Sequence, residues 1–89
     1  MANKYLHATS GTGNWTDSTG TWTTTDQGAT ATTPPTTSDV AICTVNAGAR
    51  TLTVNTNSCV AQQLNCNGFV GTLAIGASNQ LSITTNITF

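Results

Sequence analysis

Few side chains in this sequence could do chemistry. The acid–base candidates are His7 and three aspartates, because the chain has no glutamate. General acid–base catalysis needs two positioned titratable groups, yet Asp17, Asp26 and Asp39 stand where turn and strand-entry residues are expected. His7 has no neighbouring metal ligand in the sequence. We therefore predict no enzyme activity, with no catalytic residue, no metal site and no cofactor.

The three cysteines are the other reactive side chains. Cys43, Cys59 and Cys66 are odd in number and lack C-x-x-C spacing, so they support neither a closed disulfide framework nor a zinc site. We favour three free thiols, with Cys66 acting as a small buried hydrophobe. A bridge from Cys59 to Cys66 or to Cys43 is the alternative, which secretion would favour. The first six residues lack the apolar core of a secretory signal peptide.

The two tryptophans are the candidate ligand contacts. Residues 13–16 and 21–24 are expected to form a hairpin around the four-residue loop 17–20, which would place Trp15 opposite Trp22 on one face. Two adjacent indole rings could form a stacking platform for a carbohydrate. They could also be a hydrophobic lid over the first unit of a stack of strands, where such arrays need a cap. We favour the lid.

Apolar pairs recur through the second half of the chain, and they predict the elements that position these residues. Each pair has the form X-polar-X, and the pairs are Leu52/Val54, Leu64/Cys66, Leu73/Ile75, Leu81/Ile83 and Ile87/Phe89. Both members of such a pair point to one face of a strand, and Gly, Asn and Ser between pairs supply turns. The pattern predicts an all-β fold of short strands, coiled as a small β-solenoid or stacked like a β-sandwich, with the Trp hairpin as an N-terminal cap.

The same pattern predicts where the strands and turns lie. Strands are expected over 39–42, 50–55, 62–67, 72–75, 80–84 and 86–89. In the first of these, Val40 and Ile42 are expected to point inward, as are the members of the first four apolar pairs. Residues 46–49 and 68–71 are expected to be turns, and Phe69 is expected to pack beneath the second turn.

The composition favours one domain with a thin core. Of the 89 residues, 37% are hydrophobic and 6% are charged, against about 25% charged in a typical domain. The 21 threonines suit strand surfaces and the nine asparagines suit turns. Within this single domain, residues 1–33 would form the hairpin and cap, 34–38 a Pro/Thr connection, and 39–89 the repeated strands.

Low charge and modest hydrophobicity also limit the expected partners. The chain has no basic patch of the kind that binds nucleic acid, and no run of about 18 apolar residues that could span a membrane. A small core needs stability from another source, and the last strand has no Lys, Arg or Pro to protect its edge. We therefore expect an interface with another copy or another protein, involving Phe69, Asn86, Ile87 and Phe89.

Several short motifs are spread along the chain. They are Tyr5 with Gly11-Thr12-Gly13-Asn14-Trp15, Trp22, a Pro before Asp39-Val40-Ala41-Ile42, the strand at 51–54, and Gly68-Phe69-Val70-Gly71-Thr72-Leu73. Together these motifs resemble the N-terminal region of tailed-phage virion proteins of the tail-fibre, head-fibre and decoration type. A looser similarity exists to the entry region of autotransporter and adhesin β-helices. The resemblance covers nearly the whole chain, and Leu6-His7 and the Thr-rich stretch before Pro34 depart from it.

The phage resemblance implies a structural role on a particle. It implies a decoration or fibre-anchoring subunit that binds capsid or tail proteins, forms a homo-oligomer, assembles in the host cytoplasm and leaves the cell as part of the virion. No catalytic residues are implied. The alternative is a carbohydrate-binding or adhesin module in which Trp15 and Trp22 contact a surface glycan.

Overall fold

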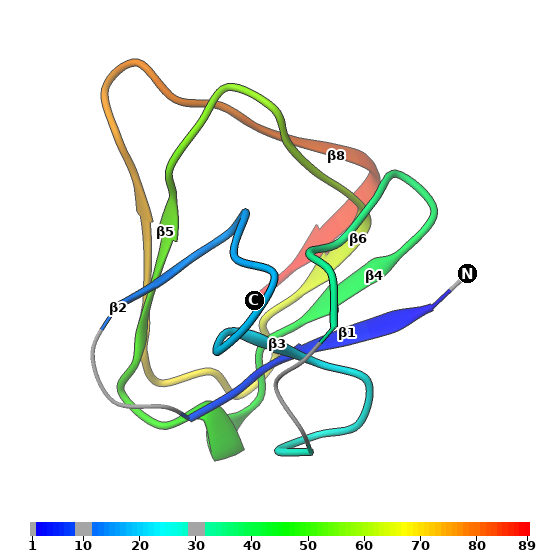
Figure 1. The fold of residues 1–89 in the computed structure, drawn as a ribbon, viewed down its shortest axis with the longest axis vertical. Helices are drawn as coiled ribbons and strands as arrows, with labels where there is room; N and C mark the ends of the chain where they lie inside the picture. The colour runs from blue at the N-terminus through cyan, green and yellow to red at the C-terminus, as the bar shows by residue number, and fades with distance from the viewer. Residues whose placement is uncertain (1, 9–11, 29–31) are drawn as a thin grey trace.

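The chain forms eight short strands and one 3-10 turn within the part that the structure describes. This computed structural model describes residues 2–8, 12–28 and 32–89 (Figure 1). The elements are β1 (Asn3–Leu6), β2 (Thr12–Asn14), β3 (Trp22–Thr23), β4 (Val40–Ile42), η1 (Val45–Ala47), β5 (Thr51–Val54), β6 (Cys59–Asn65), β7 (Thr72–Ile75) and β8 (Leu81–Thr88). The predicted all-β class is confirmed.

The strands divide between two sheets, and the chain alternates between them except at β3 and β4, which follow each other in the first sheet. The first sheet has the order β3-β1-β4-β6-β8 and the second has the order β2-β5-β7. Every neighbouring pair is parallel except β1 with β3, which is antiparallel. Parallel neighbours require a crossover between them, and here each crossover passes through the other sheet. The chain therefore coils, and Figure 1 looks along the axis of this coil.

The register of the parallel pairs stacks equivalent side chains on one another. Leu52 of β5 lies opposite Leu73 of β7, and Val54 lies opposite Ile75. Residues opposite each other in such a register share a face of the sheet. One apolar stripe therefore continues from strand to strand along the coil, which explains the recurrence of the X-polar-X pairs.

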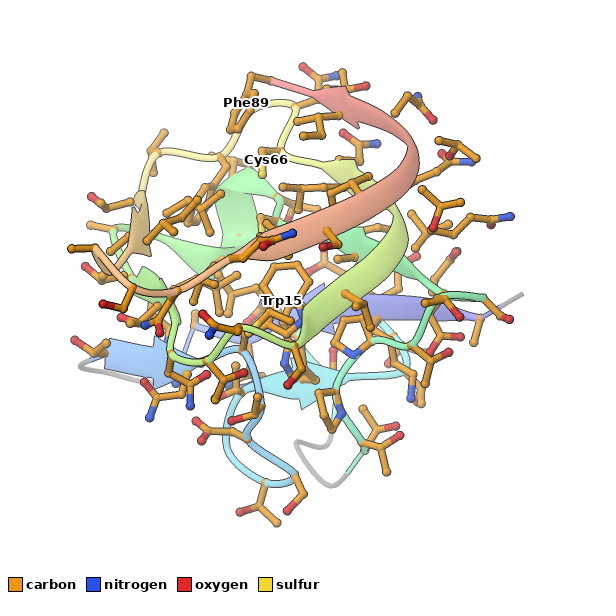
Figure 2. All side chains as sticks on the ribbon, turned by 90° about the horizontal axis from the view of Figure 1, so that it is seen from above. Trp15, Cys66 and Phe89 are labelled. Carbon is orange, nitrogen blue, oxygen red and sulfur yellow. The ribbon has the colours of Figure 1, made fainter. Side chains whose placement is uncertain are left out.

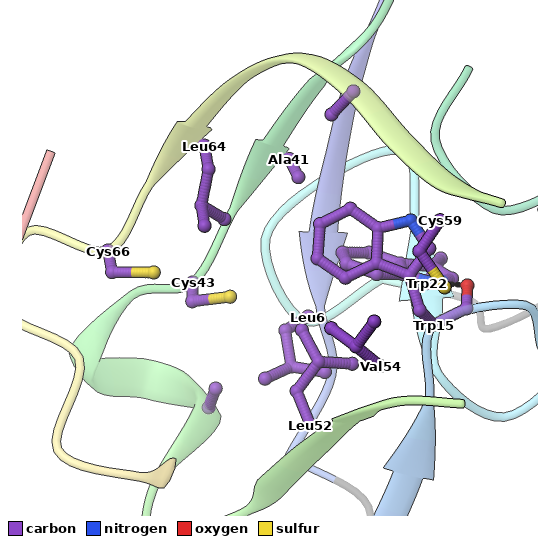
Figure 3. Packing of buried hydrophobic residues seen from close by; sticks show 12 residues of the cluster. Leu6, Trp15, Trp22, Ala41, Cys43, Leu52, Val54, Cys59, Leu64 and Cys66 are labelled. Carbon is purple, nitrogen blue, oxygen red and sulfur yellow. Dashed lines mark hydrogen bonds between the residues drawn. The ribbon is translucent and has the colours of Figure 1, made fainter. Parts of the chain in front are cut away.

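A single hydrophobic cluster fills the coil, and it draws residues from both sides of the proline pair. Its largest fully buried members include Trp15, Trp22 and Leu6 from the first third of the chain, and Figure 3 shows them beside Leu52 and Val54 of β5. The other buried members are Ala41, Cys43, Ala47, Cys59, Ala61, Leu64 and Cys66. The inward direction predicted for Leu52, Val54, Leu64 and Cys66 is confirmed by their burial.

The predicted Trp hairpin is wrong in its pairing. β2 pairs with β5 in the second sheet, whereas β3 pairs with β1 in the first, so the two segments do not form a ladder with each other. Trp15 and Trp22 still meet, with ring centroids 5.2 Å apart and an interplanar angle of 71°. The reason is that both rings enter the same core from different sheets, and the contact between them does not require that their strands be paired. Gly20 has φ +80°, as the predicted left-handed end of the loop requires.

The prediction for the direction of Val40 and Ile42 is also wrong. Ala41, between them, is 0% exposed and belongs to the core cluster, whereas Ile42 is only partly buried. Val40 is buried, at 8% exposed, but it lies outside that cluster. The cause is register, because Ala41 lies opposite Leu64 of β6 and shares its face. The two tryptophans occupy much of the interior, and an alanine is the residue of the three that leaves room for them.

The last two predicted strands form one strand, β8, which pairs with β6. The register shifts between Ala61 and Gln63, since Ala61 lies opposite Ile83 but Gln63 lies opposite Asn86. Such an irregularity bends a strand and inserts unpaired residues. The predicted break near residue 85 is therefore a bend within a continuous strand. β6 likewise begins at Cys59, three residues before the predicted start at 62.

The sequence pattern did not predict β1. Its residues, Asn3–Leu6, pair with both β3 and β4, and Lys4 is 8% exposed. The Lys4 ammonium donates hydrogen bonds to Thr32 Oγ1 and to Thr33 O and Oγ1, so it holds the segment before the prolines against β1. Desolvation of an ammonium is offset by such hydrogen bonds.

Both predicted turns are present, with local features of their own. Val45–Ala47 is a 3-10 turn capped by the Thr44 hydroxyl, which accepts a hydrogen bond from Asn46 N, and Gly48 follows with φ +66°. In the second turn Gly68 has φ +80°. Phe69 is partly buried against the core, and its ring lies against Gly71, where a Cβ would clash with both this ring and Arg50 O. The close approach explains the glycine at 71.

Candidate interaction surface

The two ends of the coil differ in how their strand edges are protected. At one end the edge strands are β3, of two residues, and β2, of three residues. At the other end they are β7, of four residues, and β8, of eight residues. Short edge strands are one way in which proteins avoid unwanted strand pairing. The β7/β8 end therefore presents the longer open backbone edges, and we call it the open end.

Apolar side chains are exposed at this open end. Val70 is 63% exposed, Ile75 53%, Ile87 53% and Phe89 76%. Figure 2 shows Phe89 at the outer end of β8, on the far side of the coil from β3, with Cys66 nearby and Trp15 deep in the interior. Leu73, Leu81 and Ile83 of the same two strands are partly buried against the core. Exposed apolar groups of this kind, grouped together, are typical of interaction sites.

The open end also carries no side-chain charge. All five charged side chains precede residue 51, so β5 to β8 and their connections contain none. Charge on an edge strand is a common protection against pairing with another chain. Its absence leaves both the exposed backbone and the apolar side chains of β7 and β8 accessible to a partner.

The four residues predicted as an interface lie in this region, but not all in the same way. Ile87 and Phe89 are exposed, and Asn86 is exposed on β8 between them and the bend. Phe69 instead packs partly against the core, and its neighbour Val70 is the exposed residue of that turn. Ile75 is predicted to point inward, and it does share the face of Val54. It is nevertheless exposed, because β7 is an edge strand and no strand covers its outer side. Sequence reasoning missed Val70 and Ile75 because the pattern does not reveal which strand is last in the stack.

Neither tryptophan offers a ring face to a ligand. Trp15 is 1% exposed and Trp22 is 0% exposed. Their indole N–H groups bond within the core, Trp22 Nε1 to Trp15 O at 2.9 Å and Trp15 Nε1 to Val60 O at 3.2 Å. A carbohydrate platform needs an open aromatic face, whereas buried indoles with satisfied N–H groups are typical of a core.

The charged side chains near Trp15 form a structural clamp. Arg50 donates to His7 O at 2.9 Å and to Thr21 Oγ1 at 3.4 Å, and Thr21 Oγ1 donates to Asp17 Oδ2 at 2.7 Å. These bonds join β5 to the end of β1 and to the loop before β3. Burial lowers the pKa of Arg50, and the nearby Asp17 carboxylate opposes this effect. The guanidinium therefore serves to connect three segments of the chain.

Asp26 and Asp39 also hold turns. Asp26 accepts hydrogen bonds from Asn46 Nδ2 at 2.9 Å and from Thr44 Oγ1, and the bond from Asn46, which outweighs the opposing effect of desolvation, lowers its pKa. Burial alone would raise the pKa of Asp39, but bonds from Thr36 N, Thr36 Oγ1 and Ala2 N, with the charge of Lys4, bring it below its ordinary value. Both carboxylates stabilise the fold in their ionised form.

We expect Asp39→Asn to weaken the dependence of stability on acid pH. A carboxyl group whose pKa is lower in the folded chain contributes stability above its unfolded pKa, about 3.9. That contribution is lost as the pH falls through the folded pKa. Urea unfolding at pH 5 and pH 2 measures the effect, with a smaller loss expected for Asp39→Asn than for the unsubstituted chain. If both chains lose the same free energy of unfolding between pH 5 and pH 2, the contacts of Asp39 do not stabilise its ionised form.

All three cysteines are free and buried, in agreement with the predicted free thiols. Cys59 stands at the start of β6, and Cys66 follows its end. Neither bridge considered from the sequence is present. Among the described residues no group of three His, Cys, Asp or Glu side chains could hold a metal ion.

The fold and this surface define the chain as a small all-β protein with a parallel coil and one apolar end. No protein-family model, no curated protein and no solved structure matches it. A search of the described residues for helices of sufficient length and hydropathy to span a membrane finds none.

Proposed function

We propose that this chain is a non-enzymatic structural subunit that assembles with a second copy through the open end and also binds other proteins. The observation that carries the proposal is the pair of unprotected edges, β7 and β8, with exposed Val70, Ile75, Ile87 and Phe89 and no charged side chain. Strand edges with apolar neighbours bind other chains by adding strands to the sheet. The aspartates and Arg50 support a structural role, because each is engaged in holding turns or segments together.

A second copy fits this end by symmetry. The first sheet has four parallel strands, β1, β4, β6 and β8, and the second has three, β2, β5 and β7, so the open end has a step of one strand. A two-fold axis perpendicular to the coil axis places β8 of each copy on β7 of the other and reverses the strand direction, which gives two antiparallel pairs. Such a contact is isologous and closed.

The particle on which the subunit acts is proposed from the sequence resemblance. A decoration or fibre-anchoring role on a tailed-phage virion, assembled in the host cytoplasm and bound to capsid or tail proteins, accords with a small, nearly uncharged all-β chain. Virions purified from the phage proposed to encode this chain test this role. The chain should co-purify in a fixed ratio to the major capsid or tail protein, and its absence from such particles would contradict the assignment.

Ile87→Lys tests the interface directly. We expect the unsubstituted chain to associate at micromolar concentration in sedimentation velocity, and Ile87→Lys to weaken association by about ten-fold or more, because a lysine on an edge strand opposes pairing. Ile87 is already 53% exposed, so the fold should tolerate the change.

Val45→Lys is the matched control for this substitution. Val45 is 59% exposed in η1, on the side of the coil between β4 and β5. The same charge placed there should leave association unchanged. A chain that stays monomeric at all concentrations, or that responds equally to the two lysines, would overturn the proposed interface.

A further inference from the structure

Cys43 and Cys66 lie side by side in neighbouring strands. Each follows directly on a register pair, Ile42 of β4 with Asn65 of β6, and Cys43 N donates to Asn65 O at 2.8 Å. Figure 3 shows both thiols pointing into the coil from adjacent backbone positions. Neighbouring strands are about 4.7–4.9 Å apart, which lies within the Cα separation of about 4.4–6.8 Å that a disulfide spans.

We propose that Cys43 and Cys66 are a dithiol pair that closes to a disulfide under oxidising conditions, joining β4 to β6 across successive turns of the coil. Cys59 is excluded from this pair by position, since it opens β6 while Cys66 follows its end. Its sulfur lies instead beside Thr56 Oγ1 at 3.6 Å and Asn55 Oδ1 at 4.0 Å. This inference does not rest on the proposed function, because the strands that the bridge joins, β4 and β6, lie inside the first sheet whether or not a partner covers the open end.

Cys66 is the thiol that reacts first. Although only 3% exposed, it lies beneath the end of β8, where its N–H donates to Thr88 O at 2.7 Å, and residues 84–89 are exposed. Local opening of this edge strand gives access to its sulfur. The hydrogen bond from the Cys43 thiol lowers the pKa of Cys66, and the same contact together with burial raises the pKa of Cys43.

The oxidant is a small disulfide such as oxidised glutathione. The Cys66 thiolate attacks one sulfur of the oxidant, forming a mixed disulfide and releasing one glutathione thiolate. The Cys43 thiol then loses its proton and attacks the Cys66 sulfur, expelling the second glutathione thiolate. Two protein thiols are oxidised by two electrons, the oxidant is reduced to two glutathione thiols, and the two protons pass to these products.

Refolding in a glutathione redox buffer distinguishes this pair from chance pairing. Loop-closure entropy alone favours the short bridge from Cys59 to Cys66 over the bridge from Cys43 to Cys66 by roughly five-fold. Peptide mapping by mass spectrometry should find Cys59–Cys66 prevailing in denaturant and Cys43–Cys66 prevailing after refolding. Persistence of the short bridge as the main native product would overturn the proposal, as would glutathione adducts without any bridge.

The variant Cys59→Ser isolates the effect of the bridge on stability. Oxidation of this variant should raise Tm by on the order of 10 °C, because the bridge lowers the conformational entropy of the unfolded chain. The matched variant Cys66→Ser, which keeps Cys43 and Cys59, should show no such rise on the same treatment. An unchanged or lower Tm after oxidation of Cys59→Ser would contradict a bridge that fits the native strands.

Discussion

Trp22→Ala is expected to destabilise the chain by about 3–5 kcal/mol, the usual cost of removing a large buried aromatic side chain. Trp22 is 0% exposed and donates its indole N–H to Trp15 O. Its ring packs edge to face on that of Trp15, with the ring centroids 5.2 Å apart. A chain of 89 residues has a total stability of roughly 4–13 kcal/mol. The substitution therefore removes a large part of what holds the fold together.

Chemical denaturation with far-UV circular dichroism measures this loss. Val45→Ala, at a position that is 59% exposed, is the control and should change stability by less than about 0.5 kcal/mol. If Trp22→Ala does not fold at all, Trp22→Phe retains an aromatic ring and gives a measurable intermediate loss. A Trp22→Ala chain as stable as the control would refute the burial of this ring.

A double-mutant cycle with Trp15→Ala and Trp22→Ala separates the ring contact from burial, because each single substitution removes one aromatic ring. The edge-to-face geometry should give a coupling energy of about 0.5–1.5 kcal/mol.

Burial of both indoles also bears on the carbohydrate-binding alternative, because a sugar would reach these rings only after the core opened. The adhesin role thus has no structural support from these two residues.

Leu52→Ala and Leu73→Ala form the second comparison, because the two leucines lie opposite each other in adjacent strands. Leu52 is 0% exposed on β5, whereas Leu73 is partly buried on the edge strand β7. We expect Leu52→Ala to cost about 2–5 kcal/mol and Leu73→Ala less than about 2 kcal/mol. The difference reflects the missing neighbour on the outer side of β7.

The protein concentration should change the stability cost of one of these two substitutions but not of the other. Urea melts of the dilute, monomeric chain should show the full difference between the two leucines. If the open end is covered by a partner copy at higher concentration, the cost of Leu73→Ala should rise there and that of Leu52→Ala should not. Equal costs in the monomer would show that β7 is covered as completely as β5.

The sequence was most informative where a strand has neighbours on both sides. Leu52 and Val54 belong to β5, Leu64 belongs to β6, and Cys66 directly follows β6. Both strands lie inside the two sheets, and all four residues are buried as the period-2 pattern predicts. The pair Leu73/Ile75 has the same pattern but lies at an edge. Periodicity reports the face on which a side chain lies; how completely it is covered depends on strand order, which periodicity does not contain.

Other errors arose where the local sequence does not determine which strand a segment pairs with, or in which register. In β4 three consecutive apolar residues give no alternation, so register with Leu64 decides that Ala41 faces the core. β1 contains Asn and Lys beside Tyr and Leu, and long-range parallel pairing with β4 makes it a strand. The Trp15–Trp22 contact was predicted, but not the two sheets from which the rings come. Of the residues predicted as an interface, Asn86, Ile87 and Phe89 are exposed and Phe69 is partly buried, and their role in an interface stays a prediction.

Hydrogen exchange of the intact chain, measured at nanomolar and at high micromolar concentration, tests most directly whether the open end is an assembly surface. Backbone amides at a strand edge exchange readily until another strand accepts their hydrogen bonds. We predict concentration-dependent protection confined to β7 and β8, with amides of β4 and β5 unchanged and with the protection reduced in Ile87→Lys. Association without new protection in β7 or β8, or equal protection at both concentrations in a chain that remains monomeric, would contradict the account.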